Sequence, residues 1–346
     1  MTRSLATPAL RLVSACFFIA ATAPATAEPA CDAAEADLRF NLAVSLDDTA
    51  EGAVAQGFAQ AADTALQGRY CITLHPDAAL FGNDAALFAA LKSGEVAFAV
   101  LPTDALLPLA PTLALIDLPF LFDTPQHVIS YLQSGAAAPL LADVADDGMA
   151  AFGILATGTR QLVGPTAILA PEDAAGLAFA LADPGPQAAA LISALGGGAA
   201  DVPADQMSAA LQSGAVQGVA ATWHTIDFDY LYAPPAIVTE TNHGVTALIL
   251  VGSSTVIAAL SAQDRKVLDD VMQNALHRQS VLAFERAQIS RQVVVDDGGR
   301  IVPLSADERA AFRTHLAPLL DAARASIGAE LIDAAIAANT AMTAQQ

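Results

Sequence analysis

A short pattern occurs twice in this sequence, and it limits the folds that the chain can adopt. The two segments read FAALKSGEVAFAV over residues 88–100 and SAALQSGAVQGVA over residues 208–220. Each has an apolar helical stretch, then a Gly able to end a helix in the left-handed conformation, then a run suited to a buried strand. The copies lie 120 residues apart, which exceeds the roughly 20–50 residues of solenoid repeats. The pattern therefore predicts two similar α/β lobes, with a chance similarity between Ala-rich helices as the alternative.

The segments around each copy extend the pattern to strand, helix, strand, helix and strand. The first half is expected to have strands at 38–44, 70–75 and 96–100, with helices at 49–67 and before Gly94. The second half is expected to have a strand from 177, a helix from 184 to about 195, and a helix that ends at Gly214 before the last strand. This alternation is typical of parallel sheets with helices on their faces. Because the repeated segment has the same place in both halves, we interpret the chain as two related lobes.

The C-terminal part is expected to be helical. Apolar positions recur from Ser261 to about Gln292, which predicts a helix of about 48 Å at 1.5 Å per residue, long enough to run along both lobes. Residues 293–305, VVVDDGGRIVPLS, are predicted to form a strand, a turn and a second strand. Ser305 and Glu308 have the spacing of a capping box for the last helices.

The first 27 residues have the features of a secretory signal peptide. Arg3 and Arg11 form a basic start, an apolar run covers residues 12–23, and Ala25-Thr26-Ala27 has the small-x-small form of a cleavage site. We therefore predict export to the periplasm and cleavage after Ala27. Lipidation at Cys16 is the alternative, but Arg11 would then lie inside the apolar region.

Charge and cysteine content limit the partners. Without residues 1–27 the chain has 13 Lys and Arg against 36 Asp and Glu, a net charge of −23. Such a surface repels nucleic acid and anionic membranes, so we predict no nucleic-acid partner.

Cys31 and Cys71 form either a disulfide, which export permits, or two separate thiols.

No catalytic, cofactor or metal motif is recognisable in the sequence. Dinucleotide loops, P-loops, the Ser elbow, C-x-x-C and H-E-x-x-H do not occur. His224, Asp227 and Asp229 lie in HTIDFDY, which does not match a known metal-ligand spacing. We therefore expect no cofactor, no metal and no enzymatic activity.

Two residues are candidates for ligand contacts. Arg160 is the only Lys or Arg between Ser93 and Asp264, and its planar fork matches a carboxylate; a structural salt bridge is the alternative. Trp223, the only Trp, follows the strand of the second copy, where α/β sheets bind ligands. It either forms a pocket wall or packs in the core.

The sequence resembles the extracytoplasmic solute receptors of tripartite ATP-independent periplasmic (TRAP) transporters, of the dicarboxylate-receptor type. The resemblance covers residues 38–335. It rests on GRYCITLHPDAALFGND, AALKSGEVAFAV, LIDLPFLFDTPQH, GTRQLVGPTAILAPEDAAGL, AALQSGAVQG and TNHG in this order.

The resemblance implies a two-lobed periplasmic binding protein fold, type II-like, with a long helix that spans both lobes. We expect lobe I to contain residues 28–156 and 247–285, and lobe II to contain residues 157–246 and 286–346. The implied function is the capture of a small organic acid between the lobes by a monomer. The ligand would then pass to the membrane subunits of a TRAP permease.

The resemblance also implies ligand-binding residues, with one departure. The family uses an Arg at the Arg160 position, but its main carboxylate-binding Arg is replaced here by Ala180, in GLAFALA. We therefore expect a monocarboxylate with an apolar portion, bound by Arg160, Phe179 and Trp223. The carboxylate of Asp183 would also suit a ligand that carries a hydrogen-bond donor or a positive charge.

Two other functions stay open at this point. One is a sensing receptor for an uncharged or amine-bearing ligand, which would have the same fold. The other is an exported enzyme, for which His243 in TNHG is the best candidate base. His243 is also a candidate ligand-binding residue if the protein is a receptor.

Overall fold

The computed structural model describes residues 36–343, apart from residues 44, 47–48, 78–79, 82 and 146–147. The predicted signal peptide and Cys31 lie outside the described residues. Cys71 is disulfide-bonded, but the predicted pairing with Cys31 stays a prediction for the same reason.

The first half begins with strand, helix, strand, helix and strand, as predicted. Strand β1 pairs in parallel with both β2 and β3. Thr49 caps α1 by accepting a hydrogen bond from the Gly52 amide, and Asn83 caps α2 in the same way. The elements are β1 (Ala36–Leu42), α1 (Ala50–Leu66), β2 (Tyr70–His75), α2 (Asp84–Ser93) and β3 (Phe98–Pro102).

The second half contains a similar parallel unit, in which β5 lies between β6 and β7. The repeated segment has the same local structure in both copies: α2 ends at Gly94 with φ +83° and α6 ends at Gly214 with φ +75°. A buried strand follows each of these glycines. The elements are β5 (Ala178–Leu181), α5 (Pro186–Ala194), β6 (Gly198–Ala200), α6 (Met207–Ser213), β7 (Gly218–Thr222) and α7 (Trp223–Phe228).

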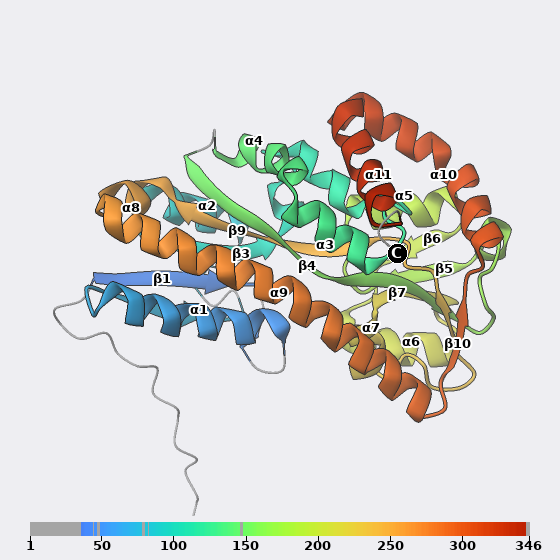
Figure 1. The fold of residues 1–346 in the computed structure, drawn as a ribbon. Helices are drawn as coiled ribbons and strands as arrows, with labels where there is room; N and C mark the ends of the chain where they lie inside the picture. Colours follow the sequence, from blue (N-terminus) through green and yellow to red (C-terminus); the bar gives the residue numbers. More distant parts are fainter. Residues whose placement is uncertain are drawn as a thin grey trace, which may run out of the picture. The chain divides into compact units, whose positions relative to one another are not determined.

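Two long strands connect the halves, as Figure 1 shows. Strand β9 (Val245–Ser253) lies between β3 and β4 (Met149–Gly164) and is antiparallel to both. Strand β4 then continues into the second half, where it pairs with β7 and with β8 (Ile237–Glu240). The order of the sheet is β2-β1-β3-β9-β4-β7-β5-β6, so β4 belongs to both halves.

Helix α9 (Ala262–Asp296) contacts α1 and β4 along the first half and α7 along the second (Figure 1). Its N-cap is Ser261, as predicted. Its end differs from the prediction, because residues 293–296 form the last helical turn and only β10 (Arg300–Pro303) is a strand. Val294 is completely buried there, among the core residues beneath α7. Tertiary packing thus outweighs the β preference of three successive valines.

The C-terminal helices pack on both halves. Helix α10 contacts α5, whereas α11 contacts α3 and the 3₁₀ helix η3, which lie in the range predicted for lobe I. The division into lobes therefore stays a prediction. The remaining elements are the 3₁₀ helices η1 (Thr103–Leu106), η2 (Pro111–Asp117), η3 (Gly135–Leu141), η4 (Pro171–Ala174) and η5 (Ala204–Gln206), and the helices α3 (Pro125–Gln133), α4 (Ala142–Ala145), α8 (Ser254–Ala259), α10 (Ala306–Ile327) and α11 (Ala329–Thr343).

Within residues 36–343, none of the helices combines the length and the apolar character that a membrane span requires.

Candidate functional site

A cavity of about 300 Å³ lies where the crossing strands meet α9. Both halves of the fold form its wall: the β1–α1 segment and β3 on one side, the end of β5 and α7 on the other. Its apolar side chains are those of Ala43, Ala50, Pro102, Trp223, Leu248, Ala283 and Ala287. Its hydroxyl groups come from Thr49, Thr157, Thr222, Thr225 and Thr246. The cavity thus has the mixed, mostly apolar lining typical of small-molecule sites.

The crossing strands supply two of these hydroxyl groups as a linked pair. Thr157 Oγ1 lies 2.7 Å from Thr246 Oγ1, and it donates to the backbone oxygen of Thr246 as well, at 3.2 Å. The ladder between β4 and β9 shifts register between Ala156 and Gly158. Such an irregularity turns side chains away from the regular alternation, and here it lies next to the cavity.

Among the residues that the structure describes, four ionisable side chains line the cavity: Glu51, Asp183, His224 and Arg286. Glu51 lies in the first turn of α1, and its Oε1 accepts a hydrogen bond from Gln279 Nε2 on α9 at 2.9 Å. Gln279 is completely buried and also donates to the Ala156 backbone oxygen at 3.1 Å. The Glu51 carboxylate is therefore held in place by a fixed amide.

Burial raises the pKa of both cavity carboxylates. For Glu51, the hydrogen bonds to its own backbone and to Gln279 oppose this shift, as do His224 and Arg286. For Asp183, the charges of Arg160 and His224 oppose it. Asp183 nevertheless has a solvent-exposed surface and lines the cavity.

The sequence left open whether Trp223 forms a pocket wall or packs in the core, and in the structure it does both. It is 3% exposed and belongs to the core beneath α7, yet it also lines the cavity. The Arg291 guanidinium lies 5.6 Å from the centre of its ring, and Arg291 is fixed by two hydrogen bonds to Glu240. The indole is therefore a rigid wall rather than a mobile cover.

Arg160 lies behind the cavity wall. It is 4% exposed and forms an ion pair with Asp117 of η2. Its Nη2 donates to the backbone oxygen of Asp183 at 3.4 Å. Burial raises the pKa of Asp117 to about 6, although Arg160 and the Val245 amide oppose the shift. The side chain thus links η2, β4 and the end of β5.

Phe179 and Ala180 lie in the core of the second half. Both are completely buried on β5. The Phe179 ring covers Gly218 of the neighbouring strand so closely that a Cβ there would lie 2.2 Å from a ring carbon. Neither residue is among those that line the cavity.

His243 lies in the connection between β8 and β9, and it too is separate from the cavity wall. It is 2% exposed, and its Nδ1 is 2.8 Å from Thr241 Oγ1. Burial, together with the charges of Arg160 and Arg309, lowers its pKa to about 3. The imidazole is therefore neutral near pH 7.

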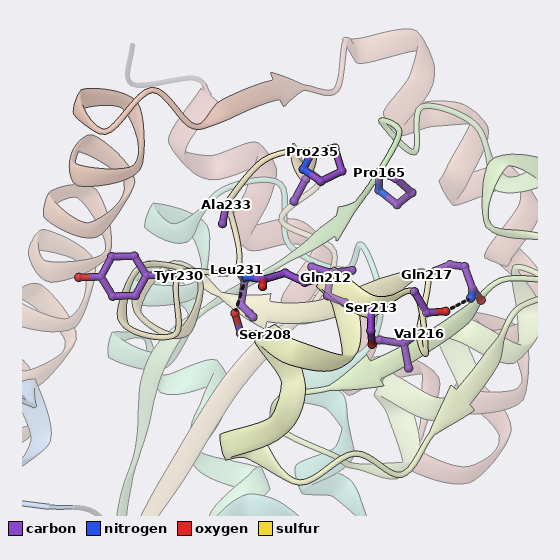
Figure 2. A pocket seen from close by; sticks show the side chains of 13 residues that line it. Pro165, Ser208, Gln212, Ser213, Val216, Gln217, Tyr230, Leu231, Ala233 and Pro235 are labelled. Carbon is purple, nitrogen blue, oxygen red and sulfur yellow. Dashed lines mark hydrogen bonds between the residues drawn. The ribbon is translucent and has the colours of Figure 1, made fainter.

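A second hollow, of about 270 Å³, lies on the surface of the second half (Figure 2). It is formed by α6 and by the segments around Pro165 and Tyr230–Ala236, and none of the described residues that line it is charged. A groove of this composition suits an organic acid less well than the cavity does. Among the described residues, no group of three or more His, Cys, Asp or Glu side chains could hold a metal ion.

A cavity that two halves of an α/β fold enclose, with connecting strands beside it, defines the class of two-lobed solute-binding proteins. The chain belongs to the DctP family, family 7 of the bacterial extracellular solute-binding proteins, whose sequence profile matches residues 40–326.

Comparison with known proteins agrees with this membership. The chain is 29% identical to the C4-dicarboxylate-binding periplasmic protein DctP of Shewanella loihica over 89% of this chain and 91% of the relative. A TRAP periplasmic solute-binding protein from Shewanella oneidensis with bound succinate has a TM-score of 0.77 at 28% identity, over 88% of this chain and 100% of that one. A counterpart from Pseudomonas aeruginosa with bound L-malate has a TM-score of 0.72 at 28% identity, over 83% and 99%. The predicted family and fold class are confirmed.

Proposed function

We propose that this protein is an extracytoplasmic receptor that binds one small organic acid in the cavity and delivers it to the membrane subunits of a TRAP-type permease. The cavity carries the proposal, because both halves of the fold line it and the strands that join them pass beside it. The relatives with bound succinate and L-malate support an organic acid as the ligand. We further propose export to the periplasm with cleavage after Ala27, and action as a monomer.

We propose a monocarboxylate with an apolar portion as the ligand class. Position 180 carries Ala, buried in β5, so it supplies no positive charge. The cavity wall includes the apolar side chains of Trp223 and Leu248, and among the described residues Arg286 is the only Arg or Lys that lines it. A single guanidinium suits a ligand with one carboxylate better than a ligand with two carboxylates.

Two residues are candidates for the carboxylate contact. Arg286 lines the cavity directly, so we propose it as the primary contact. Arg160 remains the second candidate, although its pairing with Asp117 would have to change for a ligand to reach it. Phe179 and His243 would act indirectly, by holding β5 and the β8–β9 connection.

Binding without turnover is the proposed activity. His243, the candidate base for an enzyme, has a pKa lowered to about 3 and lies away from the cavity wall. A base of this pKa takes up protons poorly near neutral pH. Conversion of a bound organic acid, detected by mass spectrometry, would contradict the proposal.

The test is isothermal titration of the purified protein with organic acids. We expect saturable binding of monocarboxylates with apolar portions, and weaker binding of succinate and L-malate. Arg286→Gln should weaken binding by about 10- to 100-fold, which corresponds to about 1.4–2.8 kcal/mol. Arg278→Gln, an exposed position on the same helix, makes the same charge change away from the cavity and should leave affinity unchanged. If no organic acid binds the wild-type protein, the proposed function is wrong.

A further inference from the structure

The charges around the cavity do not match a simple organic anion. Among the described residues that line the cavity, two are acids, Glu51 and Asp183, against one guanidinium, Arg286, and one imidazole, His224. The basic groups of the wall therefore do not outnumber its acids. A ligand whose only charge is a carboxylate would add a third negative group to this space, where like charges repel more strongly than in bulk water.

Neighbouring groups strengthen this imbalance. Burial raises the pKa of Asp104 of η1; the charge of Arg160 opposes this shift, and the nearby charge of Asp183 adds to it. The nearest interior cation, Arg160, is already paired with Asp117 and reaches only the backbone oxygen of Asp183. The positive charge of Arg160 is thus shared among three carboxyl groups, those of Asp117, Asp183 and Asp104.

The two cavity carboxylates are available to a ligand. Within the part of the chain that the structure describes, neither Glu51 nor Asp183 forms an ion pair. Glu51 accepts a neutral hydrogen bond from Gln279 at 2.9 Å, which fixes its position without neutralising its charge. A half-buried carboxylate of this kind gains most from a cationic partner.

We propose that the ligand carries a protonated amine in addition to its carboxylate, and that Glu51 and Asp183 bind this amine. This inference rests on the proposed function and names the ligand class for the same cavity: a zwitterionic organic acid with an apolar portion. In this proposal the ammonium group contacts Glu51 and Asp183, and the carboxylate contacts Arg286. The described residues offer no group of three metal-ligating side chains, so an organic cation fits these carboxylates better than a metal ion does.

Matched probe pairs test the inference by isothermal titration. The pairs are 5-aminopentanoate with pentanoate and phenylalanine with 3-phenylpropanoate, which differ only in the amine. We expect the amine-bearing member of at least one pair to bind at least about tenfold more tightly, the gain of one well-placed charged contact. Gluconate tests the alternative that hydroxyl groups are the donors.

Variants assign the effect to the two carboxylates. Glu51→Gln keeps an oxygen that can accept the hydrogen bond from Gln279, and Asp183→Asn keeps the shape of the side chain. Each should reduce the preference for the amine-bearing probe to about threefold or less. Glu285→Gln and Asp205→Asn remove one negative charge at exposed positions and should leave the preference unchanged. Thermal melting of each variant checks that it is folded.

The outcomes are distinguishable. If pentanoate and 3-phenylpropanoate both bind as tightly as their amine-bearing partners, or if gluconate binds most tightly, the inference is wrong while the proposed function stands. A preference for the amine that survives in both Glu51→Gln and Asp183→Asn also overturns it. If none of these acids, nor succinate nor L-malate, binds the wild-type protein, the proposed function and the inference fail together.

Discussion

At the scale of single residues, the ion pair between Arg160 and Asp117 is almost completely removed from solvent, with side chains 5% and 10% exposed. Arg160→Gln would leave the Asp117 carboxylate buried without its partner, so we expect a loss of about 3–5 kcal/mol in the free energy of unfolding. The double variant with Asp117→Asn should lose less than the sum of the single changes. Urea unfolding measures these differences.

An exposed pair serves as the control for this prediction. Arg39 and Asp37 have side chains 46% and 39% exposed, so Arg39→Gln should change stability by less than about 1 kcal/mol. Equal effects of Arg39→Gln and Arg160→Gln would contradict a structural role for the buried pair. Ligand affinity of Arg160→Gln, measured separately, decides whether Arg160 also contacts the ligand.

His243 predicts a pH dependence of stability. Its pKa is about 3 in the folded protein and about 6.5 when unfolded, so the unfolded chain binds the extra proton between these values. The stabilisation is complete above pH 6.5 and is lost as the pH falls toward 3. Asp117 acts in the opposite sense: its pKa is raised to about 6, so its ionisation costs stability above that pH and the cost disappears on acidification.

A variant separates the two contributions. His243→Asn preserves a polar contact to Thr241 and removes the titration. Relative to this variant, the wild-type protein should lose about 2 kcal/mol between pH 6.5 and pH 5. Urea unfolding at both pH values measures the difference. A stability difference that does not change with pH would show that the His243 pKa is not lowered.

The sequence could predict part of the candidate site. Asp183 and Trp223 line the cavity, but Glu51, His224 and Arg286 line it too and were not predicted as ligand contacts. An acid in the first turn of a helix, such as Glu51, is common because the helix dipole favours it. Arg286 is one of many charged residues on a long helix. Only the fold brings these residues together, and only it places Asp117 opposite Arg160.

At the scale of secondary-structure elements, the two repeated helices offer a matched pair of tests. Gly94 and Gly214 end α2 and α6 with positive φ, a conformation that costs other residues about 1 kcal/mol or more. A Cβ at Gly214 would meet open space, whereas one at Gly94 would lie 3.3 Å from a Val256 methyl group.

Gly214→Ala should therefore destabilise the protein by about 1 kcal/mol, and Gly94→Ala by more, because crowding adds to the backbone strain. Chemical denaturation compares the two. A neutral effect of Gly214→Ala would mean that the end of α6 does not need the left-handed conformation.

Elements with local signals were predictable, and those decided by packing were not. Caps such as Thr49 and Ser305 and the glycine ends of α2 and α6 depend on neighbouring residues, so the sequence alone indicates them. The last turn of α9 contains Val293–Val295, whose local preference is for a strand. The burial of Val294 in the core beneath α7 decides that turn, and the sequence does not show which core it joins.

At the scale of the whole molecule, β4 belongs to both halves of the sheet and α9 packs on both. We therefore expect the halves to unfold together, in one transition. In differential scanning calorimetry the van't Hoff and calorimetric enthalpies should agree. Two resolved transitions would show that the halves are independent despite the shared strand.

The position of β9 between β3 and β4 also affects when the molecule can fold during its synthesis. Strand β4 ends at Gly164 and β9 begins at Val245. A nascent chain that has reached residue 244 contains both neighbours of β9 but not the strand that separates them. The sheet of the first half needs β9 between β3 and β4, so it cannot be completed until residue 253 has been synthesised. Pairing between strands that lie so far apart in the sequence is also slow to form. Most of the polypeptide is thus made before its core can close.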